Sequence, residues 1–122
     1  MAGVKTMTTY RTLNDALPVG DVEVWYMNPT YFREGITGSR PEAGFLEKTH
    51  ILLGKVEGKH TQEGMDKMWI SLQGESWSPN GEAWSLITQL GLRHTSMSVG
   101  DCFRFPNGEV WVVAPCGFRM VA

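Results

Sequence analysis

Two neighbouring stretches of the chain carry the apolar spacing of amphipathic helices, and this feature most limits the folds available to it. In both stretches apolar residues stand at positions i, i+3, i+4 and i+7, which lie on one face of a helix. The residues are Met65, Met68, Trp69 and Leu72 in the first stretch, and Ala83, Leu86, Ile87 and Leu90 in the second. Because an apolar helix face must be covered, both helices need another layer to pack against.

The residues that flank these stretches are typical of helix ends. Thr61 is expected to cap the first helix and Gly74 to stop it. Ser78 can accept hydrogen bonds from the free amides of the second helix, and Pro79 loses no bond at its first position. Gly91 suits the left-handed residue that commonly ends a helix.

Shorter apolar stretches, bounded by turn residues, predict strands on either side of the helices. The predicted strands are Asp21–Met27, Thr49–Glu57, Cys102–Phe105, Glu109–Val113 and Phe118–Val121. We expect a bulge at Gly54, and a tight hairpin in which Asn107 and Gly108 both take positive φ. The order predicts an α+β fold, β-β-α-α-β-β-β, with two helices packed on one face of a mainly antiparallel sheet.

The length of the chain fits one domain. Its 122 residues, 42% of them hydrophobic, suffice for a single core and are too few for two. We therefore expect one domain over residues 1–122. Residues 1–18 show no sustained period and are expected to begin as a loose arm, and residues 28–48 carry dense turn residues that predict a long loop.

Charge and hydropathy disfavour several classes of partner. The net charge of -2 neither coats phosphates nor imitates a polyanion. The first residues lack the apolar run of a signal peptide, and no apolar stretch is long enough to span a bilayer. We expect a cytoplasmic protein with no membrane partner. Self-association through a patch among its five tryptophans and seven methionines stays open.

No metal or cofactor site is predicted. His50, His60 and His94 are widely spaced, and Cys102 and Cys116 do not form a C-x-x-C pair. The phosphate-binding patterns G-x-x-x-x-G-K and G-x-G-x-x-G are absent. We interpret the histidines as exposed or singly hydrogen-bonded side chains, and the cysteines as buried thiols rather than a disulfide.

The segment from Arg93 to Asp101 is the densest polar cluster, and three interpretations of it stay open. A hydrolase would use His94 as base, Ser96 or Ser98 as nucleophile, and Asp101 as the carboxylate that orients the base. No G-x-S-x-G elbow accompanies these residues. In the second, structural interpretation, the serines and Asp101 hydrogen-bond the backbone of a helix-to-strand crossing.

The third interpretation is recognition of a partner. Arg93 and His94 follow a helix end on a loop, where a rigid scaffold can present them. Trp77 lies between the two helices and outside both apolar stripes, so it is expected either to join this surface or to pack over the loop. The candidate binding residues are Arg93, His94, Ser96, Ser98, Asp101 and Trp77.

Nucleic-acid binding is a further alternative. It requires arginines to gather on one face despite the negative net charge. The arginines concerned are Arg11, Arg33, Arg40, Arg104 and Arg119. The overall charge disfavours this alternative.

The part of the chain from Trp77 to Phe118 resembles small accessory proteins of phages and plasmids, including YodL-like domains. In these proteins a Ser-Met-Ser-Val-x-Asp run precedes a strand, and a Gly-Phe pair comes near the end. Here the run is Ser96 to Asp101 and the pair is Gly117-Phe118, while residues 77–81 are also similar. The resemblance implies a mobile-element context, and it attaches no catalytic role to Ser96, Ser98 or Asp101.

Together these observations predict a non-enzymatic accessory protein of a phage or plasmid that binds a host or defence-system protein in the bacterial cytoplasm. The alternatives are a small hydrolase that uses His94 with Ser96 or Ser98, and a nucleic-acid-binding module. Neither alternative calls for a bound cofactor.

Overall fold

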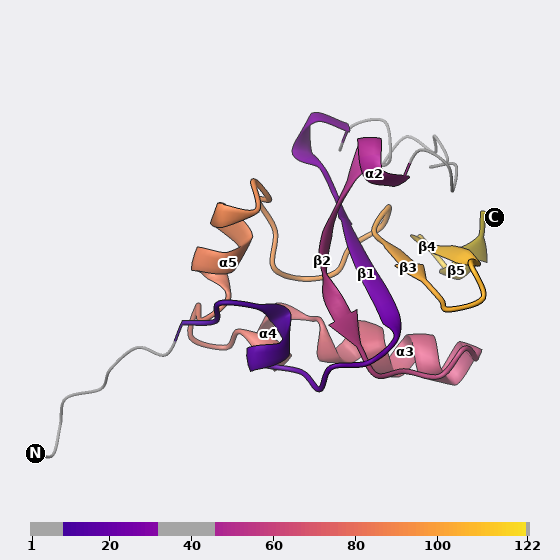
Figure 1. Ribbon diagram of the computed structural model, residues 1–122, viewed down its shortest axis with the longest axis horizontal. Coiled ribbons are helices and arrows are strands. Elements are labelled where there is room, and N and C mark those ends of the chain that lie inside the picture. Colours follow the sequence, from indigo (N-terminus) through magenta and orange to yellow (C-terminus); the bar gives the residue numbers. More distant parts are fainter. Residues whose placement is uncertain (1–8, 32–45, 122) are drawn as a thin grey trace, which may run out of the picture.

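The computed structural model describes residues 9–31 and 46–121, which form an antiparallel sheet with short helices (Figure 1). The strands are β1 (Val22–Met27), β2 (His50–Val56), β3 (Cys102–Arg104), β4 (Val110–Ala114) and β5 (Gly117–Met120). The helices are η1 (Leu13–Asp15), η2 (Pro29–Tyr31), α2 (Leu46–Thr49), α3 (Gln62–Ser71), α4 (Gly74–Trp77) and α5 (Trp84–Gln89). The predicted α+β class and the β-β-α-α-β-β-β order are confirmed, with several additional short helices.

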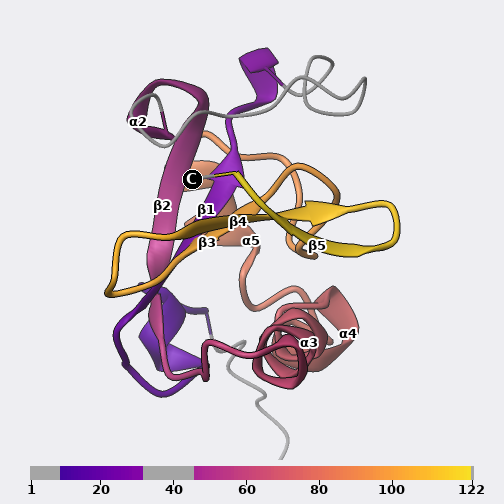
Figure 2. The ribbon, with the colours of Figure 1, turned by 90° about the vertical axis from the view of Figure 1, so that its right-hand side faces the viewer.

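The strands lie in the spatial order β2-β1-β3-β4-β5, and each neighbouring pair is antiparallel. β1 and β2 cross the centre of Figure 1, and β3, β4 and β5 extend to one side of them. Figure 2, seen from that side, places α3 and α4 below the strands β3 to β5. β2 and β5 are therefore the two edges of the sheet.

The main core lies on the face of the sheet that α3 and α5 cover. Alternate residues of β1 point into it, because successive side chains of a strand point to opposite faces. Its members include Val22, Val24 and Tyr26 of β1, Phe103 of β3, Met65 and Met68 of α3, and Leu86 and Ile87 of α5. Both predicted helices thus bury most of their apolar stripes against the same sheet face, whereas Trp69 and Leu90 are only partly buried.

The opposite face of the sheet is covered as well. Trp25, Cys102, Val110 and Val112 form a second buried cluster with Leu46 of α2. Because both faces are buried, the central strands are apolar at successive positions rather than strictly alternating.

The helix α3 begins as predicted and ends earlier. The hydroxyl of Thr61 accepts a hydrogen bond from the amide of Gly64 at 2.9 Å, which is a capping bond. The helix ends at Ser71, and Gly74 opens α4 instead of stopping α3. The prediction for Gly74 is therefore wrong, because its amide donates to Ser96 Oγ at 2.7 Å and starts a new turn.

The end of α5 follows the prediction from Gly91. This glycine has a φ of 76°, in the left-handed region. The amide of Leu92 donates to the carbonyl of Ile87 at 2.9 Å, and the amide of Gly91 donates to that of Thr88 at 3.0 Å. These two bonds satisfy the last carbonyls of the helix in the motif that favours glycine.

The start of α5 differs from the prediction. Pro79 does not begin the helix, which starts at Trp84. The hydroxyl of Ser78 accepts from the amide of Ala83 at 2.9 Å, so it closes a turn that precedes the helix. This bond spans five residues, whereas a capping bond reaches the second or third residue of the helix, so Ser78 is not the cap of α5.

The hairpin between β3 and β4 differs from the prediction at one residue. Gly108 has a φ of 90°, as predicted. In the described part of the chain only glycines have a positive φ, so the prediction of a positive φ for Asn107 is wrong. The amide of Gly108 donates to the carbonyl of Phe105, and the amide of Phe105 to that of Glu109, both at 2.9 Å. The result is a three-residue loop that ends in a left-handed glycine.

The N-terminal segment packs against the predicted bulge of β2. The pairing register shifts between Val24 and Trp25, opposite Gly54, which confirms the bulge. Leu13 is fully buried there, and a Cβ at Gly54 would lie 2.8 Å from the Leu13 Cβ. Residues 9–18 are therefore part of the packed domain rather than a loose arm, and the residues before them lie outside the described part.

The two cysteines are free thiols with different surroundings. Cys102 is buried, as predicted, whereas Cys116 is exposed in the turn between β4 and β5. The prediction of a buried thiol is therefore wrong for Cys116.

The predicted long loop falls mainly on residues 32–45, which lie outside the described residues. Within residues 9–31 and 46–121, no helix is long and apolar enough to cross a membrane.

Candidate functional site

The connector, residues 93–101, runs from α5 to β3 and is organised around a buried carboxylate. The side chain of Asp101 is fully buried. Its Oδ1 accepts a hydrogen bond from the amide of Met27 in β1 at 2.7 Å. Its Oδ2 lies 2.8 Å from both the amide of Ser98 and Nε2 of His94. Asp101 therefore ties the connector to the end of β1.

The imidazole of His94 is held by both its edge and its face. Its edge meets Asp101, and its face stacks on Tyr26 with ring centroids 4.7 Å apart. The hydroxyl of Tyr26 donates to the carbonyl of Thr95 at 2.7 Å. Burial, and next the charge of Asp101, raise the pKa of Tyr26, so this hydroxyl stays protonated and keeps its role as donor.

The two serine hydroxyls contact backbone atoms. Ser96 Oγ accepts from the amide of Gly74 at 2.7 Å, and Ser98 Oγ donates to the carbonyl of Ser96 at 2.9 Å. The amide of Asp101 also donates to the carbonyl of Ser98 at 3.0 Å. These contacts match the structural interpretation of the segment. A hydrolase would instead need one of these hydroxyls on the imidazole of His94.

The recognition residues predicted from sequence divide into exposed and buried ones. Arg93 is exposed and His94 is partly buried, so both reach the surface. Trp77 is only 2% exposed, donates from Nε1 to the carbonyl of Thr95 at 3.0 Å and stacks on Tyr10. Trp77 and the fully buried Asp101 cannot touch a partner directly, and the packing interpretation of Trp77 describes its position.

His50 is a buried polar residue whose surroundings differ from its interpretation as exposed or singly bonded. It is 4% exposed. Its Nε2 donates to the carbonyl of Gly100 at 2.7 Å, so in the neutral ring Nδ1 accepts from the hydroxyl of Thr49 at 2.8 Å. Burial lowers the pKa of His50, opposed by the bond to Gly100 and the charge of Asp101. The sequence does contain one sign that His50 is buried, because it lies within an apolar stretch that predicts a strand.

Cys102 lies beside His50 in the same buried region. Its Sγ is 3.6 Å from Nε2 of His50 and 3.7 Å from the carbonyl of Gly100. Burial, and next the charge of Asp101, raise the pKa of the Cys102 thiol far above its usual range. The thiol is therefore protonated and is not a nucleophile.

A groove of about 480 Å³ opens beside the connector. One wall is α3 with Trp69 and Gln73, the second is residues 97–99 of the connector, and the third is the β4–β5 hairpin with Phe118. The side-chain amide of Gln73 donates to the carbonyls of Trp69 and Met97 at 3.0 and 3.1 Å, which joins the first two walls. The sequence places Trp69 on a buried stripe, whereas in the structure it is partly exposed and lines the groove.

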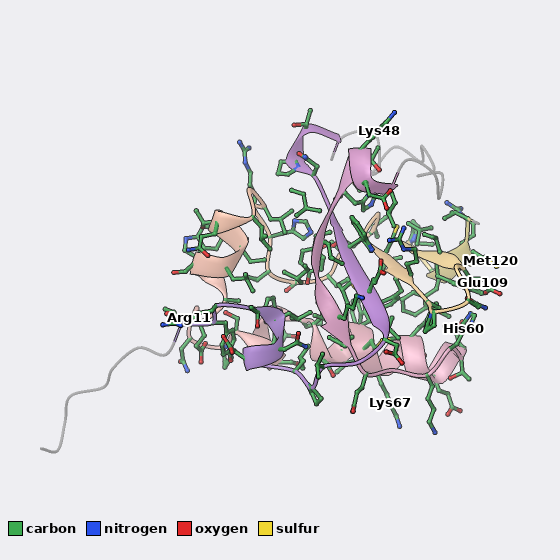
Figure 3. The ribbon with its side chains drawn as sticks, in the orientation of Figure 1. Arg11, Lys48, His60, Lys67, Glu109 and Met120 are labelled. Atoms are coloured by element: carbon green, nitrogen blue, oxygen red, sulfur yellow. The ribbon has the colours of Figure 1, made fainter. Side chains whose placement is uncertain are left out.

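The histidines do not build a metal centre in the part of the chain that the structure describes. His60 stacks on Phe105 with ring centroids 4.1 Å apart, and its Nε2 lies 2.8 Å from Glu109 Oε1. Figure 3 shows His60 and Glu109 at the same end of the molecule. Among the described residues, no group of three or more His, Cys, Asp or Glu side chains is placed to hold a metal ion.

The described arginines do not gather on one face. Arg104 is engaged by Glu23 at 2.7 Å and by Glu47 at 3.1 Å. Figure 3 shows Arg11 at the opposite end of the molecule from Met120, which follows Arg119 in β5. The other two arginines lie outside the described residues: Arg33 and Arg40.

Comparisons with known proteins give no match to this chain among family models, curated proteins or solved structures.

Proposed function

We propose that this chain is a non-enzymatic binding protein that holds a segment of a partner protein in the groove between α3, the connector and the β4–β5 hairpin. The groove itself carries the proposal, because it offers about 480 Å³ beside the segment that the sequence marks for recognition. A concave, largely apolar cleft with a few polar groups is the usual form of a binding site.

The lining of the groove suits a protein segment. Trp69, Val99 and Phe118 line it and are partly buried, so each offers apolar surface to a partner. Asp66 and Ser98 add polar groups. A few aromatic anchors commonly supply most of the binding energy of a protein interface.

The connector supports binding through its shape. Asp101 holds Ser98 and His94 in place, and Ser96 bonds to the start of α4. These contacts fix residues 97–99 as a groove wall. Rigid walls favour binding because little conformational freedom is lost when the partner enters.

The class of partner rests on the resemblance of the Ser96 to Asp101 run to YodL-like accessory proteins of phages and plasmids. We propose a host or defence-system protein in the bacterial cytoplasm as the partner. In this proposal the motif shapes the groove through Ser98 and Val99, which line it.

The test compares a groove variant with a matched surface variant. Val99→Glu places a carboxylate in the apolar groove, whereas Val19→Glu makes the same change at a residue that is 67% exposed and outside the groove. Both variants should keep the circular dichroism spectrum of the unchanged protein. A partner captured from bacterial lysate, then purified and measured by calorimetry, should bind Val99→Glu at least about tenfold more weakly.

Equal binding to the unchanged protein and to both variants would place the interface elsewhere. Capture of no protein above background from lysates of several bacterial hosts would remove the proposal.

A further inference from the structure

Among the described residues, no strand pairs with the outer side of β5, and this edge beside the groove indicates how a partner segment is held. We infer that an extended segment of the partner pairs with β5 as a further strand of the sheet, with apolar side chains toward the groove and an acidic side chain toward Arg119. This inference rests on the proposed binding function and specifies its geometry.

The main-chain groups of β5 that face outward follow from its pairing with β4. The amide of Val121 donates to the carbonyl of Val110 at 2.8 Å, so the main chain of Val121 faces β4. In an antiparallel pair the direction alternates along the strand. The N-H and C=O groups of Phe118 and Met120 therefore point away from β4, toward the open edge.

The hydrogen bonds on the other side of β4 give the same result. Val113 donates to the carbonyl of Asp101 at 2.8 Å and accepts from the amide of Gly100 at 2.9 Å, so its main chain faces away from β5. Its partner in β5 is Phe118. This pair is consequently not hydrogen-bonded, and Phe118 presents both groups to an added strand.

The side chains of the same two residues lie on the groove side of the sheet. Met120 is opposite Trp111, and Phe118 is opposite Val113, and both of these β4 residues pack against the main core. Met120 is 50% exposed, and Phe118 lines the groove. Every second side chain of an added strand would lie beside them, so an apolar residue there is covered by the groove.

Arg119 supplies charge complementarity on the opposite side of β5. It is exposed, and among the described residues it makes no ion pair. An acidic residue of an added strand, placed across from it, would form a favourable cross-strand pair. The occupant is therefore an extended segment that alternates apolar and polar residues and carries a carboxylate among the polar ones.

The same arginine disfavours a second copy of this chain as the occupant. A symmetric antiparallel pair that uses the outward groups of both Phe118 and Met120 is centred on Arg119. The two copies would then set Arg119 directly across from Arg119, and like charges in that position are unfavourable.

The experiment selects binders from a display library of random linear peptides of about ten residues, a length that spans a typical strand. The bait is the full chain. The tightest peptides are then synthesised and measured by calorimetry and by amide hydrogen exchange. We expect carboxylate-containing peptides that protect the amides of Phe118 and Met120, and that lose binding when alternate peptide amides are N-methylated.

The matched variants are Met120→Pro and Met120→Ala. Proline removes the outward N-H of residue 120 without removing a bond to β4, and proline is tolerated at such an edge position. Alanine shortens the side chain and keeps the N-H. Met120→Pro should weaken the selected peptides by about tenfold, and Met120→Ala by clearly less. Arg119→Glu should shift the selected peptides from acidic to basic.

The other outcomes overturn the inference in distinguishable ways. Peptides that bind Met120→Pro normally but fail on Val99→Glu would leave the groove function standing without strand pairing. Peptides that bind both variants normally would count against the groove and the edge together. No enriched peptide, or a dimer of the unchanged protein that Met120→Pro abolishes, would each rule out pairing with a foreign segment.

Discussion

Asp101 is the residue on which the shape of the connector depends most. Its two carboxylate oxygens face the amides of Met27 and Ser98 and the imidazole of His94. In Asp101→Asn one of these oxygens becomes an NH2 group, so this hydrogen-bond donor faces the N-H donor of Met27 or Ser98. Since the site is fully buried, we expect a loss of about 2–4 kcal/mol in the free energy of unfolding.

Urea denaturation checks this prediction, with Asp21→Asn as control because Asp21 is exposed. The control should change the free energy of unfolding by no more than about 0.5 kcal/mol. Similar values for the two variants would mean that the carboxylate of Asp101 does not organise the connector.

His50 makes the stability of the fold depend on pH. Its pKa in the folded protein is lowered from 6.5 by burial, so between the folded and unfolded values the unfolded chain binds more protons. The contribution of neutral His50 to the free energy of unfolding is therefore fully present above about pH 6.5. It is lost as the pH is lowered, by up to about 1.4 kcal/mol per pH unit. Buried Tyr26 and Cys102 contribute nothing in this window, since their pKa values are raised.

The measurement is the free energy of unfolding between about pH 5 and 7, for the unchanged protein and His50→Gln. Glutamine keeps a donor for the carbonyl of Gly100 and does not titrate. The pKa values of Asp15 and Glu109 are lowered from their ordinary values of 3.8 and 4.5, so these carboxylates change the stability only below this pH window. Parallel curves for the two proteins would refute the assignment to His50.

The helix α5 depends on its C-terminal glycine. Gly91 has a φ of 76°, and a Cβ added there would meet nothing within 4 Å, so a substitution has a backbone cost alone. We expect Gly91→Ala to lower the free energy of unfolding by about 1 kcal/mol, and Gly91→Asn by less, because asparagine tolerates the left-handed region. Ser85→Ala, on the exposed side of α5, is the matched control.

Thermal denaturation of the three variants orders these effects. An unchanged midpoint for Gly91→Ala would show that α5 can end without the left-handed residue. A midpoint for Ser85→Ala as low as that of Gly91→Ala would point to α5 as a whole rather than to its end.

The features predicted correctly from the sequence are those that depend on contacts between residues close together in the chain. The cap at Thr61 and the end at Gly91 depend on bonds within a few residues, and both appear where expected. The start of α5 does not, because burial of Trp77 and its bond to Thr95 set the path of residues 77–83. Propensity and spacing say nothing of such contacts, which join positions far apart in the chain.

The candidate site shows the same division. Ser96, Ser98 and Asp101 stand out in the sequence, and their structural role is one of the interpretations it allows. The groove could not be predicted, because its walls come from α3, the connector and the β4–β5 hairpin. The strands β3, β4 and β5 follow one another in the sequence, whereas β3 joins the rest of the sheet by pairing with the distant strand β1. No local pattern in the sequence predicts such a pairing.

At the scale of the molecule, the two edges of the sheet are treated differently. The N-terminal segment covers the C-terminal end of β2: Asn14 Nδ2 donates to the carbonyl of Lys55 at 2.7 Å, and the amide of Glu57 donates to the carbonyl of Pro18 at 3.3 Å. An uncovered edge strand invites pairing with other chains. The fold thus protects this end of β2 with its own backbone and side chains, and β5 is the edge on which the proposed segment pairs.

Leu13 anchors this cover, because it is fully buried against Gly54 of β2. Leu13→Ala should lower the free energy of unfolding by about 2–4 kcal/mol and speed hydrogen exchange at Glu57, whose amide would lose its partner. Val19→Ala, at a residue 67% exposed, should do neither. If Leu13→Ala behaved like this control, residues 9–18 would be a detachable arm after all. The molecule would then have two open edges, and the preference of a partner for β5 would need another cause.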